Sequence, residues 1–464
     1  MRTTLERELK LDADLGFELP DLGEPLEPRV FTSTYYDTEP RSLLRAGITL
    51  RRRVEHGLSR WQLKLPRDEA RAEIEAPGGP AGPPEELRRL LVAHLRHGAL
   101  VPVATLRTRR VGVRVGDGGR ALADVTFDAV DVLEGQRQAG GFHELEIELL
   151  DGDAADLERL ARALRRAGAR RSDGLPKVMR VVGVGRDDGE AKPSALEQVR
   201  ALLLRQLREL ETHDPGVRLG DEPEDVHRFR VATRRTRALA RVARPLVGEQ
   251  LAGLAGELKW LAGLLGPVRD LDVLIVDVSR GVATLGDDRA GGEALVAGLE
   301  EQRESARDRL LEGLSSTRYL TLLDLFEATV GELRGDGGAD LGPLAAGALR
   351  KLRKQARRLP ATPPDAQIHE LRKTAKRARY AAELAGGGEP RLRKLVDALK
   401  RVQDVSGEHQ DAVVAEEALR ARARGRMAVA AGRLIEREQM RRGEAREQLP
   451  DAVDRALELG RKRL

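Results

Sequence analysis

Hydrophobic and polar positions alternate with a period of two along much of the first 185 residues. Clusters of Gly, Pro and Asp, as at 77–84 and 116–119, separate the alternating segments. Such alternation between turn residues is typical of antiparallel strands. The predicted strands are Glu6–Leu11, Ile48–Arg53, Arg60–Leu65, Arg71–Glu75, Arg109–Val115, Ala121–Asp128 and His143–Leu149. With helices expected at Glu85–His97 and Ala154–Ala167, residues 1–185 are predicted to form an α+β domain built on an antiparallel sheet or β-barrel.

The period changes to 3.6 near residue 195 and stays there to the end of the printed sequence. These stretches are rich in Ala, Leu, Arg and Glu, which favour helices. The intervening residues 186–194, RDDGEAKPS, are polar and contain Gly and Pro, so we expect a linker there. The sequence therefore predicts a multidomain protein in which an all-α helical-bundle domain occupies residues 195–464.

The helical half also repeats internally. Two blocks recur in the same order with nearly equal spacing, and the second pair aligns Gly266 with Gly407 and Asp270 with Asp411. The matched blocks are Val226–Val242 with Ile368–Leu384, and Leu258–Asp272 with Leu399–Val413. We therefore expect two repeats, at about 195–335 and 343–464, related by an approximate two-fold axis.

Composition narrows the possible classes of function. The chain has no Cys, which excludes disulfides, Fe–S clusters, thiolate zinc sites and Cys nucleophiles. Lys and Arg total 81 against 76 Asp and Glu, so the net charge of +5 permits a polyanionic partner without requiring one. The first residues are charged and no stretch of about 18 apolar residues occurs, so we expect a cytoplasmic protein without a membrane partner.

The polar faces of the predicted strands carry segregated charges. Residues i, i+2 and i+4 share one face of a strand, which groups Glu6 with Glu8 and Lys10, and Arg51 with Arg53. On a single strand such a face is usually the solvated side of a sheet. Because the segregation extends over seven strands, the sequence favours an alternative in which the polar faces line a tunnel.

A tunnel with inward-facing charges needs charged ligands. Two cations about 6 Å apart repel by roughly 3 kcal/mol at an effective dielectric constant near 20, so clustered Arg and Lys require an anion. Arg binds phosphate oxygens in a two-point fashion. Clustered carboxylates bind hard cations such as Mg²⁺ or Mn²⁺. Cations for phosphate combined with carboxylates for metal indicate phosphoryl-transfer chemistry.

The motif Glu6-x-Glu8-x-Lys10 resembles the signature of the CYTH family, also called triphosphate tunnel metalloenzymes. Further family elements follow in order: Tyr35-Tyr36-Asp37-Thr38, Leu50-Arg51-Arg52-Arg53, Lys64, Glu73, Arg107-x-Arg109, Glu144-x-Glu146-x-Glu148 and Lys177 with Arg180. The resemblance covers about residues 1–185. It implies an eight-stranded antiparallel tunnel that admits a linear triphosphate.

The CYTH resemblance also implies roles for individual residues. One or two Mg²⁺ or Mn²⁺ ions are expected on Glu6, Glu8, Glu144 and Glu146. The phosphates are expected to be held by Lys10, Arg51, Arg53, Lys64, Arg107, Arg109 and Lys177. The residues expected to take part in catalysis are Glu6, Glu8, Lys10 and Glu146. They would act by positioning and charge neutralisation rather than by covalent catalysis.

Each copy of the helical repeat contains a basic stripe. The spacing i, i+3, i+7, i+10 places four residues on one helix face, and like charges so arranged destabilise a helix unless an anion meets them. The stripes are His227, Arg230, Arg234 and Arg237 in the first copy, and His369, Arg372, Lys376 and Arg379 in the second. A single stripe is usually solvated surface, but its duplication with a leading His favours a binding role. The His spacing does not suit zinc.

The helical half resembles the CHAD family over residues 195–464, and the order CYTH then CHAD is a known architecture. This resemblance implies that the two stripes bind inorganic polyphosphate, with an affinity that falls as salt rises. The leading hypothesis is an inorganic triphosphatase that acts on tripolyphosphate. Alternatives are a nucleoside or thiamine triphosphatase, an adenylyl cyclase, or a non-catalytic polyphosphate-binding scaffold. Nucleic-acid binding is disfavoured because base-stacking aromatics are scarce, and the sequence predicts no particular oligomeric state.

Overall fold

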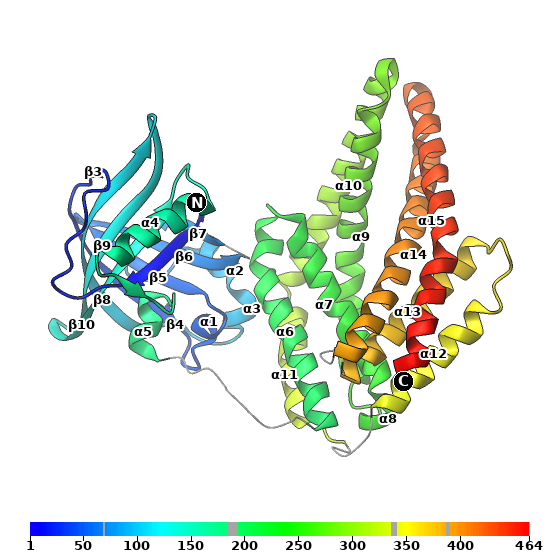
Figure 1. The fold of residues 1–464 in the computed structure, drawn as a ribbon, viewed down its shortest axis with the longest axis horizontal. Coiled ribbons are helices and arrows are strands. Elements are labelled where there is room, and N and C mark those ends of the chain that lie inside the picture. The colour runs from blue at the N-terminus through cyan, green and yellow to red at the C-terminus, as the bar shows by residue number, and fades with distance from the viewer. Residues whose placement is uncertain (68–69, 184–193, 336–340, 387–389, 464) are drawn as a thin grey trace. The chain divides into compact units, whose positions relative to one another are not determined.

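The computed structural model describes residues 1–67, 70–183, 194–335, 341–386 and 390–463. The chain divides into two compact units, an N-terminal unit at Met1–Gly189 and a C-terminal unit at Glu190–Leu464 (Figure 1). The linker expected at 186–194 lies, apart from Ser194, outside the described residues. No helix in the described ranges combines the length and the hydrophobicity that a membrane crossing requires.

The N-terminal unit is built on one antiparallel sheet, in which the described residues form eleven strands. The order across the sheet is β1 (Arg2–Glu6), β7 (Ala70–Pro77), β6 (Leu58–Arg67), β5 (Thr49–Glu55), β4 (Arg29–Asp37), β8 (Val101–Asp117), β9 (Arg120–Glu134), β10 (Arg137–Leu149), β2 (Glu8–Asp12) and β11 (Arg170–Arg171). The short β3 (Glu24–Pro25) pairs with β8. The strands predicted from the alternation are present, although Glu6–Leu11 is divided at Arg7 between β1 and β2. The alternation did not reveal β3, β4 or β11.

The sheet curves so that β1 and β2, near its two ends, are consecutive in the sequence and are connected by a single residue. Strands β1 and β2 flank Arg7; β1 pairs with β7, and β2 pairs with β10. The Arg7 carbonyl accepts a hydrogen bond from Leu149 N at 2.9 Å. The hydrogen-bonded path does not close, because β1 and β2 do not pair with each other. In place of the expected closed tunnel of eight strands, the sheet is therefore an open path of ten strands with β3 beside it, and Arg7 joins β1 to β2.

Short helices accompany the sheet: α1 (Ser42–Arg45), α2 (Glu85–Leu90), α3 (Val92–Leu95), α4 (Ala154–Arg166) and α5 (Lys177–Val182). The helix expected at Glu85–His97 is divided into α2 and α3. Helix α4 begins with a reciprocal capping box between Asp153 and Asp156. Its apolar side packs on the sheet in a core that includes Leu145 and Ile147. Since side chains alternate along a strand, Glu144, Glu146 and Glu148 lie on the opposite face of β10.

The C-terminal unit is helical throughout its described residues. Its helices are α6 (Ala195–Leu219), α7 (Pro223–Val242), α8 (Arg244–Val247), α9 (Ala252–Val282), α10 (Arg289–Leu314), α11 (Thr317–Glu332), α12 (Gly342–Ala356), α13 (Asp365–Leu384), α14 (Pro390–Arg422) and α15 (Ala428–Arg463). Figure 1 shows α9 beside α10 and α14 beside α15 as two long helical pairs. Helices α7 and α13 both have 20 residues. Helix α13 is followed by α14 of 33 residues, and α7 is followed, after the four-residue α8, by α9 of 31 residues. This correspondence agrees with the repeat expected from the sequence.

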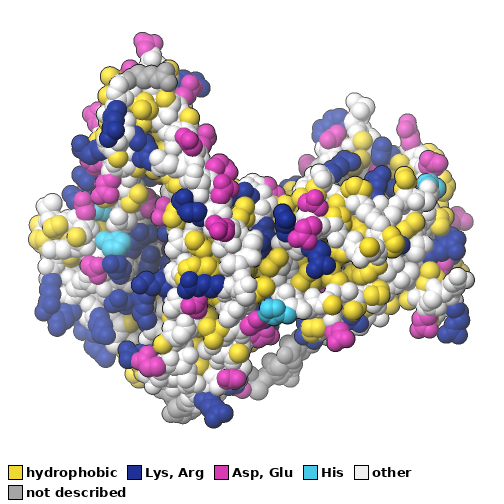
Figure 2. Space-filling model, turned by 180° about the vertical axis from the view of Figure 1, so that it is seen from behind, with side chains coloured by type: hydrophobic (Ala, Val, Ile, Leu, Met, Phe, Trp, Pro, Cys, Tyr) yellow, Lys and Arg dark blue, Asp and Glu magenta, His cyan; other side chains and the backbone are white. Residues whose placement is uncertain are grey.

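The cores of the C-terminal unit consist mainly of Leu, Ala and Val, as the low aromatic content requires. One core joins α12, α13, α14 and α15 around Leu371 and Leu399. A second core joins α9, α10, α14 and α15 around Val278 and Leu434. The same helices also bury charged side chains, such as Asp277 of α9 and Glu438 of α15, which lie outside these apolar clusters. Figure 2 shows that Lys and Arg lie interspersed with Asp and Glu over one face of the molecule.

Candidate functional site

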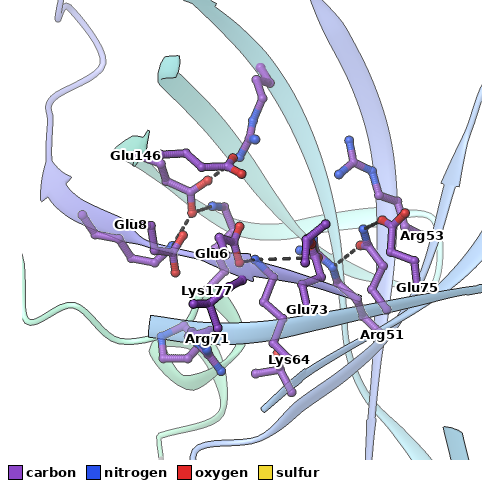
Figure 3. A pocket seen from close by; sticks show the side chains of 18 of the residues that line it. Glu6, Glu8, Arg51, Arg53, Lys64, Arg71, Glu73, Glu75, Glu146 and Lys177 are labelled. Atoms are coloured by element: carbon purple, nitrogen blue, oxygen red, sulfur yellow. Dashed lines mark hydrogen bonds and ion pairs between the residues drawn. The ribbon is translucent and has the colours of Figure 1, made fainter. Parts of the chain in front are cut away.

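A cavity of about 810 Å³ lies in the N-terminal unit, on the sheet face opposite the α4 core. Charged side chains from both ends of the N-terminal unit, such as Glu6 and Lys177, point into it (Figure 3). The predicted site residues that line this charged cavity are Glu6, Glu8, Lys10, Arg51, Arg53, Lys64, Glu146 and Lys177. The alternation of each strand therefore turns these charges inward, around one shared space.

Strand register explains why opposite charges meet in the cavity. Lys10 of β2 stands directly opposite Glu146 of β10, and Lys64 of β6 stands opposite Glu73 of β7. Directly paired positions place their side chains on the same face of the sheet. The register thus places Lys10 and Lys64 each beside an inward carboxylate, which lowers the cost of burying both charges.

Three carboxylates form a compact group that we call the acidic cluster: Asp128, Glu144 and Glu146. One oxygen from each residue lies within 4.8 Å of the others. Asp128 and Glu144 stand opposite each other on β9 and β10, and their side chains are 0% and 1% exposed. Among the described residues, this is the group of carboxylates with the closest spacing for a metal ion.

Cations of the protein itself surround the acidic cluster. The Lys177 Nζ lies 3.0 Å from Asp128 Oδ2 and 2.7 Å from Glu146 Oε1, and it also donates to Glu144. The Lys10 Nζ lies 3.3 Å from Glu144 Oε1 and pairs with Glu146. Burial by itself would raise the pKa of Glu146, but Lys10 and Lys177 hold that pKa well below its usual value. Glu146 is therefore an anion that attracts cations.

Arg110 is a cavity residue that the sequence reasoning missed. It lines the cavity and donates to both Asp128 and Glu146. The expectation that Arg107 and Arg109 line the cavity is wrong: both alternate with Arg110 along β8 and therefore project from its other face. The Arg109 side chain is 57% exposed and pairs with Asp131.

A second group of carboxylates lies around Lys64. The Lys64 Nζ is 2.5 Å from Glu6 Oε2 and 3.8 Å from Glu73 Oε1. Burial raises the pKa of Glu6. Burial, together with the neighbouring Glu6, raises the pKa of Glu148 to about 7. The cavity therefore contains a carboxyl group that can exchange a proton near neutral pH.

The four expected metal ligands are not all brought together. Glu144 and Glu146 join Asp128 in the acidic cluster, whereas Glu6 lies at Lys64. Glu8 lies 3.6 Å from the Lys10 Nζ. Burial by itself would raise the pKa of Glu8, but Lys10, Lys64 and Lys177 together lower it. The expected set therefore divides along the cavity wall, and Asp128 is the ligand candidate that the sequence reasoning left out.

Two buried arginines extend the positive side of the cavity. Arg51 donates to Gln62 at 2.7 Å and to the Tyr35 hydroxyl at 3.1 Å. Arg53 lies 3.5 Å from the centroid of the Phe31 ring, and its Nε is buried without a hydrogen-bond acceptor among the described residues. Burial and the nearby Arg51 lower the pKa of Arg53 to about 10. An anion placed here would gain a hydrogen bond that the protein does not use itself.

The donor set of the acidic cluster fits a hard divalent cation. Its three carboxylates supply oxygen ligands, which Mg²⁺ and Mn²⁺ prefer. The ammonium of Lys177 among them shows that this position accommodates a positive charge. The residues present thus suit the metal that the CYTH resemblance implies.

The motif Tyr35-Tyr36-Asp37-Thr38 is mainly structural. Asp37 is fully buried, and its carboxylate accepts hydrogen bonds from the backbone N–H groups of Thr38, Leu43 and Leu44 at 2.7, 2.9 and 3.0 Å. These bonds hold the first turn of α1, whose N-cap residue Arg41 has a φ of 61° and supplies no side-chain cap. The motif therefore fixes the chain between β4 and β5.

The two basic stripes of the C-terminal unit converge. Helices α7 and α13 contact each other, and Arg230 and Arg234 of α7 lie near enough to Arg372 and Lys376 of α13 to lower their pKa values. Burial first, and then Arg372, lower the pKa of Lys376 to about 7. The Nε atoms of Arg234 and Arg372 are buried without hydrogen-bond acceptors among the described residues. We call Arg230, Arg234, Arg372 and Lys376 the basic cluster.

Arg379 and His369 have local partners, as does Arg230 of the basic cluster, whose Nη1 lies 2.9 Å from Asp270 Oδ1. Arg379 is 9% exposed and lies 3.2 Å from Glu383. His369 Nδ1 is 2.8 Å from Gln410 Oε1. Burial and the nearby Arg269 lower the pKa of His227, and burial and Arg241 lower that of Arg237. The stripes therefore contribute unequally, with the strongest mutual repulsion at the basic cluster.

Comparisons with known proteins divide the chain in the same way. The CYTH domain family matches residues 5–177, and the CHAD domain family matches residues 201–420. Among solved structures, PptA from Streptomyces chartreusis is 23% identical, covering 56% of this chain and 99% of its own, with a TM-score of 0.47. The CHAD domain from the plant Ricinus communis is 25% identical, covering 59% and 95%, with a TM-score of 0.47.

A third solved structure resembles the chain over a shorter length. It is a putative adenylyl cyclase from Hippeastrum, described as having a dominant triphosphatase activity. It is 15% identical, covering 39% of this chain and 97% of its own, with a TM-score of 0.26. No curated protein matches the chain.

Proposed function

The chain carries a CYTH domain followed by a CHAD domain, and we propose that the first hydrolyses linear inorganic triphosphate while the second binds inorganic polyphosphate. The observation that carries the proposal is the charged cavity, in which Arg51, Arg53 and Lys64 face the same space as Glu146. Cations for phosphate oxygens and carboxylates for a metal ion are the two requirements of phosphoanhydride cleavage.

The proposed roles follow from the contacts in the cavity. Arg51 and Arg53 would hold phosphate oxygens, because both are buried and Arg53 has an unused donor. Lys10 and Lys64 would neutralise charge beside them. Mg²⁺ or Mn²⁺ bound by Asp128, Glu144 and Glu146 would stabilise the negative charge that develops on the transferred phosphoryl group.

Glu148 is the proposed general base. A base works best when its pKa lies near the working pH, and the pKa of Glu148 is raised to about 7. Glu148 lines the cavity together with the phosphate-binding cations. It would accept a proton from the attacking water, and the resulting hydroxide would form a bond to the terminal phosphorus as the bridging oxygen leaves.

The aromatic residues of the cavity favour an inorganic substrate over a nucleotide or thiamine triphosphate. The aromatic side chains in its lining are Phe31 and Tyr35. The guanidinium of Arg53 lies over the Phe31 ring, and that of Arg51 lies 5.9 Å from the Tyr35 centroid. Neither ring is free to stack on an organic base without displacing a proposed phosphate ligand.

Phosphate release tests this function. The full chain would be assayed with tripolyphosphate, ATP and thiamine triphosphate, each with Mg²⁺ or Mn²⁺, alongside a Glu146→Gln variant. We expect the highest kcat/KM for tripolyphosphate and a loss of at least a hundredfold in Glu146→Gln. A preference for ATP would identify a nucleoside triphosphatase. Absence of turnover on all three substrates would leave a binding scaffold.

Polyphosphate binding by the C-terminal unit rests on the unmet donors of the basic cluster. Repulsion among four cations falls when a polyanion lies between them, and release of counterions makes the binding sensitive to salt. Electrophoretic retardation of long-chain polyphosphate by the full chain and by an Arg234→Ala, Arg372→Ala double variant would test this. The control is Arg350→Ala, Arg357→Ala, at exposed positions of α12 and its C-cap. Equal or tighter binding of RNA would favour the nucleic-acid alternative.

A further inference from the structure

Lys177 occupies an unusual position for a substrate-binding lysine. Its side chain is 7% exposed, and its ammonium contacts all three carboxylates of the acidic cluster. Its Nζ donates hydrogen bonds to Glu144 and Glu146, and its third contact is the 3.0 Å ion pair with Asp128. The Lys177 ammonium is therefore held by the acidic cluster rather than turned toward a phosphate in this arrangement.

The acidic cluster does not depend on Lys177 for its charge balance. Arg110 also pairs with Asp128 and Glu146. Lys10 pairs with Glu144 and Glu146, and the Arg180 Nη1 lies 3.5 Å from Glu144 Oε2. Each carboxylate thus retains another cationic partner if the Lys177 ammonium leaves, so its departure exposes no unpaired buried charge.

The ammonium and a divalent cation compete for the same place. Lys177 lies at hydrogen-bond distance, 2.7–3.0 Å, from Glu146 and Asp128. Mg²⁺ binds carboxylate oxygens at about 2.0–2.1 Å, and so small a volume between three carboxylates cannot hold both cations. Their mutual repulsion adds to the exclusion.

The fold gives the displaced side chain a place to go. Lys177 is the first residue of α5 and follows Pro176, and both residues line the charged cavity. A lysine side chain has four rotatable bonds, so the ammonium can leave the acidic cluster while its backbone stays in place. Its new surroundings would be the space in which the phosphates are proposed to lie.

We propose that Lys177 is a built-in substitute for the divalent cation, holding the metal position until the metal arrives and then moving into the cavity to bind substrate. The identity of that substrate rests on the proposed function; the exchange itself does not. It makes binding ordered and cooperative, since the metal both completes the acidic cluster and releases a cation for the anion that follows.

Metal binding without substrate tests the exchange. Mn²⁺ would be titrated into the full chain by calorimetry, comparing the natural protein with Lys177→Met. Removal of the competing ammonium should tighten Mn²⁺ binding at least tenfold. The matched control is Lys64→Met, which removes the same charge from the same cavity beside Glu6. Unchanged or weaker Mn²⁺ binding in Lys177→Met, or equal tightening in Lys64→Met, would overturn the proposal.

A second measurement needs no variant. Acetylation by acetic anhydride, followed by mass spectrometry, reports how accessible each lysine is in the natural protein. Lys177 should be protected without metal and at least threefold more reactive with Mn²⁺. Equal protection in both states would contradict the exchange. Because neither measurement contains a triphosphate, their outcome is independent of whether the cavity hydrolyses one.

Discussion

Arg110 donates two hydrogen bonds to the Asp128 carboxylate, from Nε to Oδ1 at 2.7 Å and from Nη2 to Oδ2 at 2.6 Å. The two residues stand directly opposite in the pairing of β8 with β9, and the Asp128 side chain is 0% exposed. Burial opposes the charge on Arg110, but Glu146 and Asp128 raise its pKa well above the usual value. This ion pair fixes one wall of the acidic cluster.

Replacement of Arg110 by Ala should damage both stability and turnover. It removes the two-point partner of the buried Asp128 carboxylate, but Lys177 still pairs with Asp128 at 3.0 Å. The loss should therefore stay below the roughly 3–5 kcal/mol that leaving a buried charge unpaired costs. Urea denaturation and tripolyphosphate hydrolysis measure the two effects. The control is Arg109→Ala, whose exposed side chain should change the free energy of unfolding by no more than about 0.5 kcal/mol. Similar losses of stability and turnover in Arg110→Ala and Arg109→Ala would contradict the placement of Arg110, rather than Arg109, in the cavity.

Asp37→Ala should destabilise the N-terminal unit without impairing the chemistry. Three backbone N–H groups lose their acceptor, and at about 1 kcal/mol for each hydrogen bond the loss is roughly 3 kcal/mol. Chemical denaturation measures this loss. Turnover per folded molecule, corrected by the folded fraction at the assay temperature, should remain within about twofold of the natural protein. A large drop in the corrected turnover would instead place Asp37 in the catalytic machinery.

Glu148 should make stability depend on pH. Its pKa is about 7 in the folded protein, above the usual 4.5. Between these values the folded protein holds a proton that the unfolded chain has released. The contribution of Glu148 to the free energy of unfolding therefore falls as pH rises from 4.5 to 7. Glu148→Gln removes the effect and should be more stable than the natural protein at pH 8, by roughly 2 kcal/mol after allowance for partial exposure.

Thermal unfolding across pH 4–8 measures that difference. The two stability curves should meet near pH 4.5 and separate as pH rises. Glu134→Gln serves as the control, because the Glu134 side chain is 70% exposed and pairs only with Arg137 among the ion partners described. Parallel curves for Glu148→Gln and the natural protein would show that Glu148 ionises normally.

Polyphosphate binding should be coupled to proton uptake by Lys376. Burial and the neighbouring Arg372, Arg234 and Arg230 lower its pKa to about 7, and an adjacent polyanion would raise it again. Affinity should therefore be greatest below pH 7 and fall above it, by up to about tenfold per pH unit. Binding assays at constant ionic strength between pH 6 and 9 measure this dependence.

Lys376→Met should flatten that pH dependence and weaken binding mainly at low pH. Lys373→Met is the matched control, since Lys373 lies one turn earlier on α13, is exposed and pairs with Glu370 at 2.7 Å. Lys373→Met should keep the pH profile of the natural protein. Titration of the polyphosphate itself affects all variants equally, so a difference between the two variants reports on Lys376. If the polyphosphate affinities of Lys376→Met and the natural protein fall in parallel as pH rises, Lys376 is not the group whose protonation is coupled to binding.

The sequence determined the class of each half and much of the cavity. A period of two or 3.6 is a local property of the chain, so it identified the strands and helices without knowledge of their partners. Alternation within a strand placed Glu6 with Glu8, and Arg51 with Arg53, on common faces. The ordered CYTH elements then indicated that those faces turn inward, and the structure places these residues around one cavity.

Tertiary structure alone decided which arginine of β8 turns inward and which carboxylates meet. In the run 107–110 both faces of the strand carry an arginine, so the periodicity could not choose, and a shift of one residue in register reverses every side chain. The meeting of Lys177 with Asp128, and of α7 with α13, joins residues distant in sequence. Such contacts depend on strand register and helix packing, which no local pattern records.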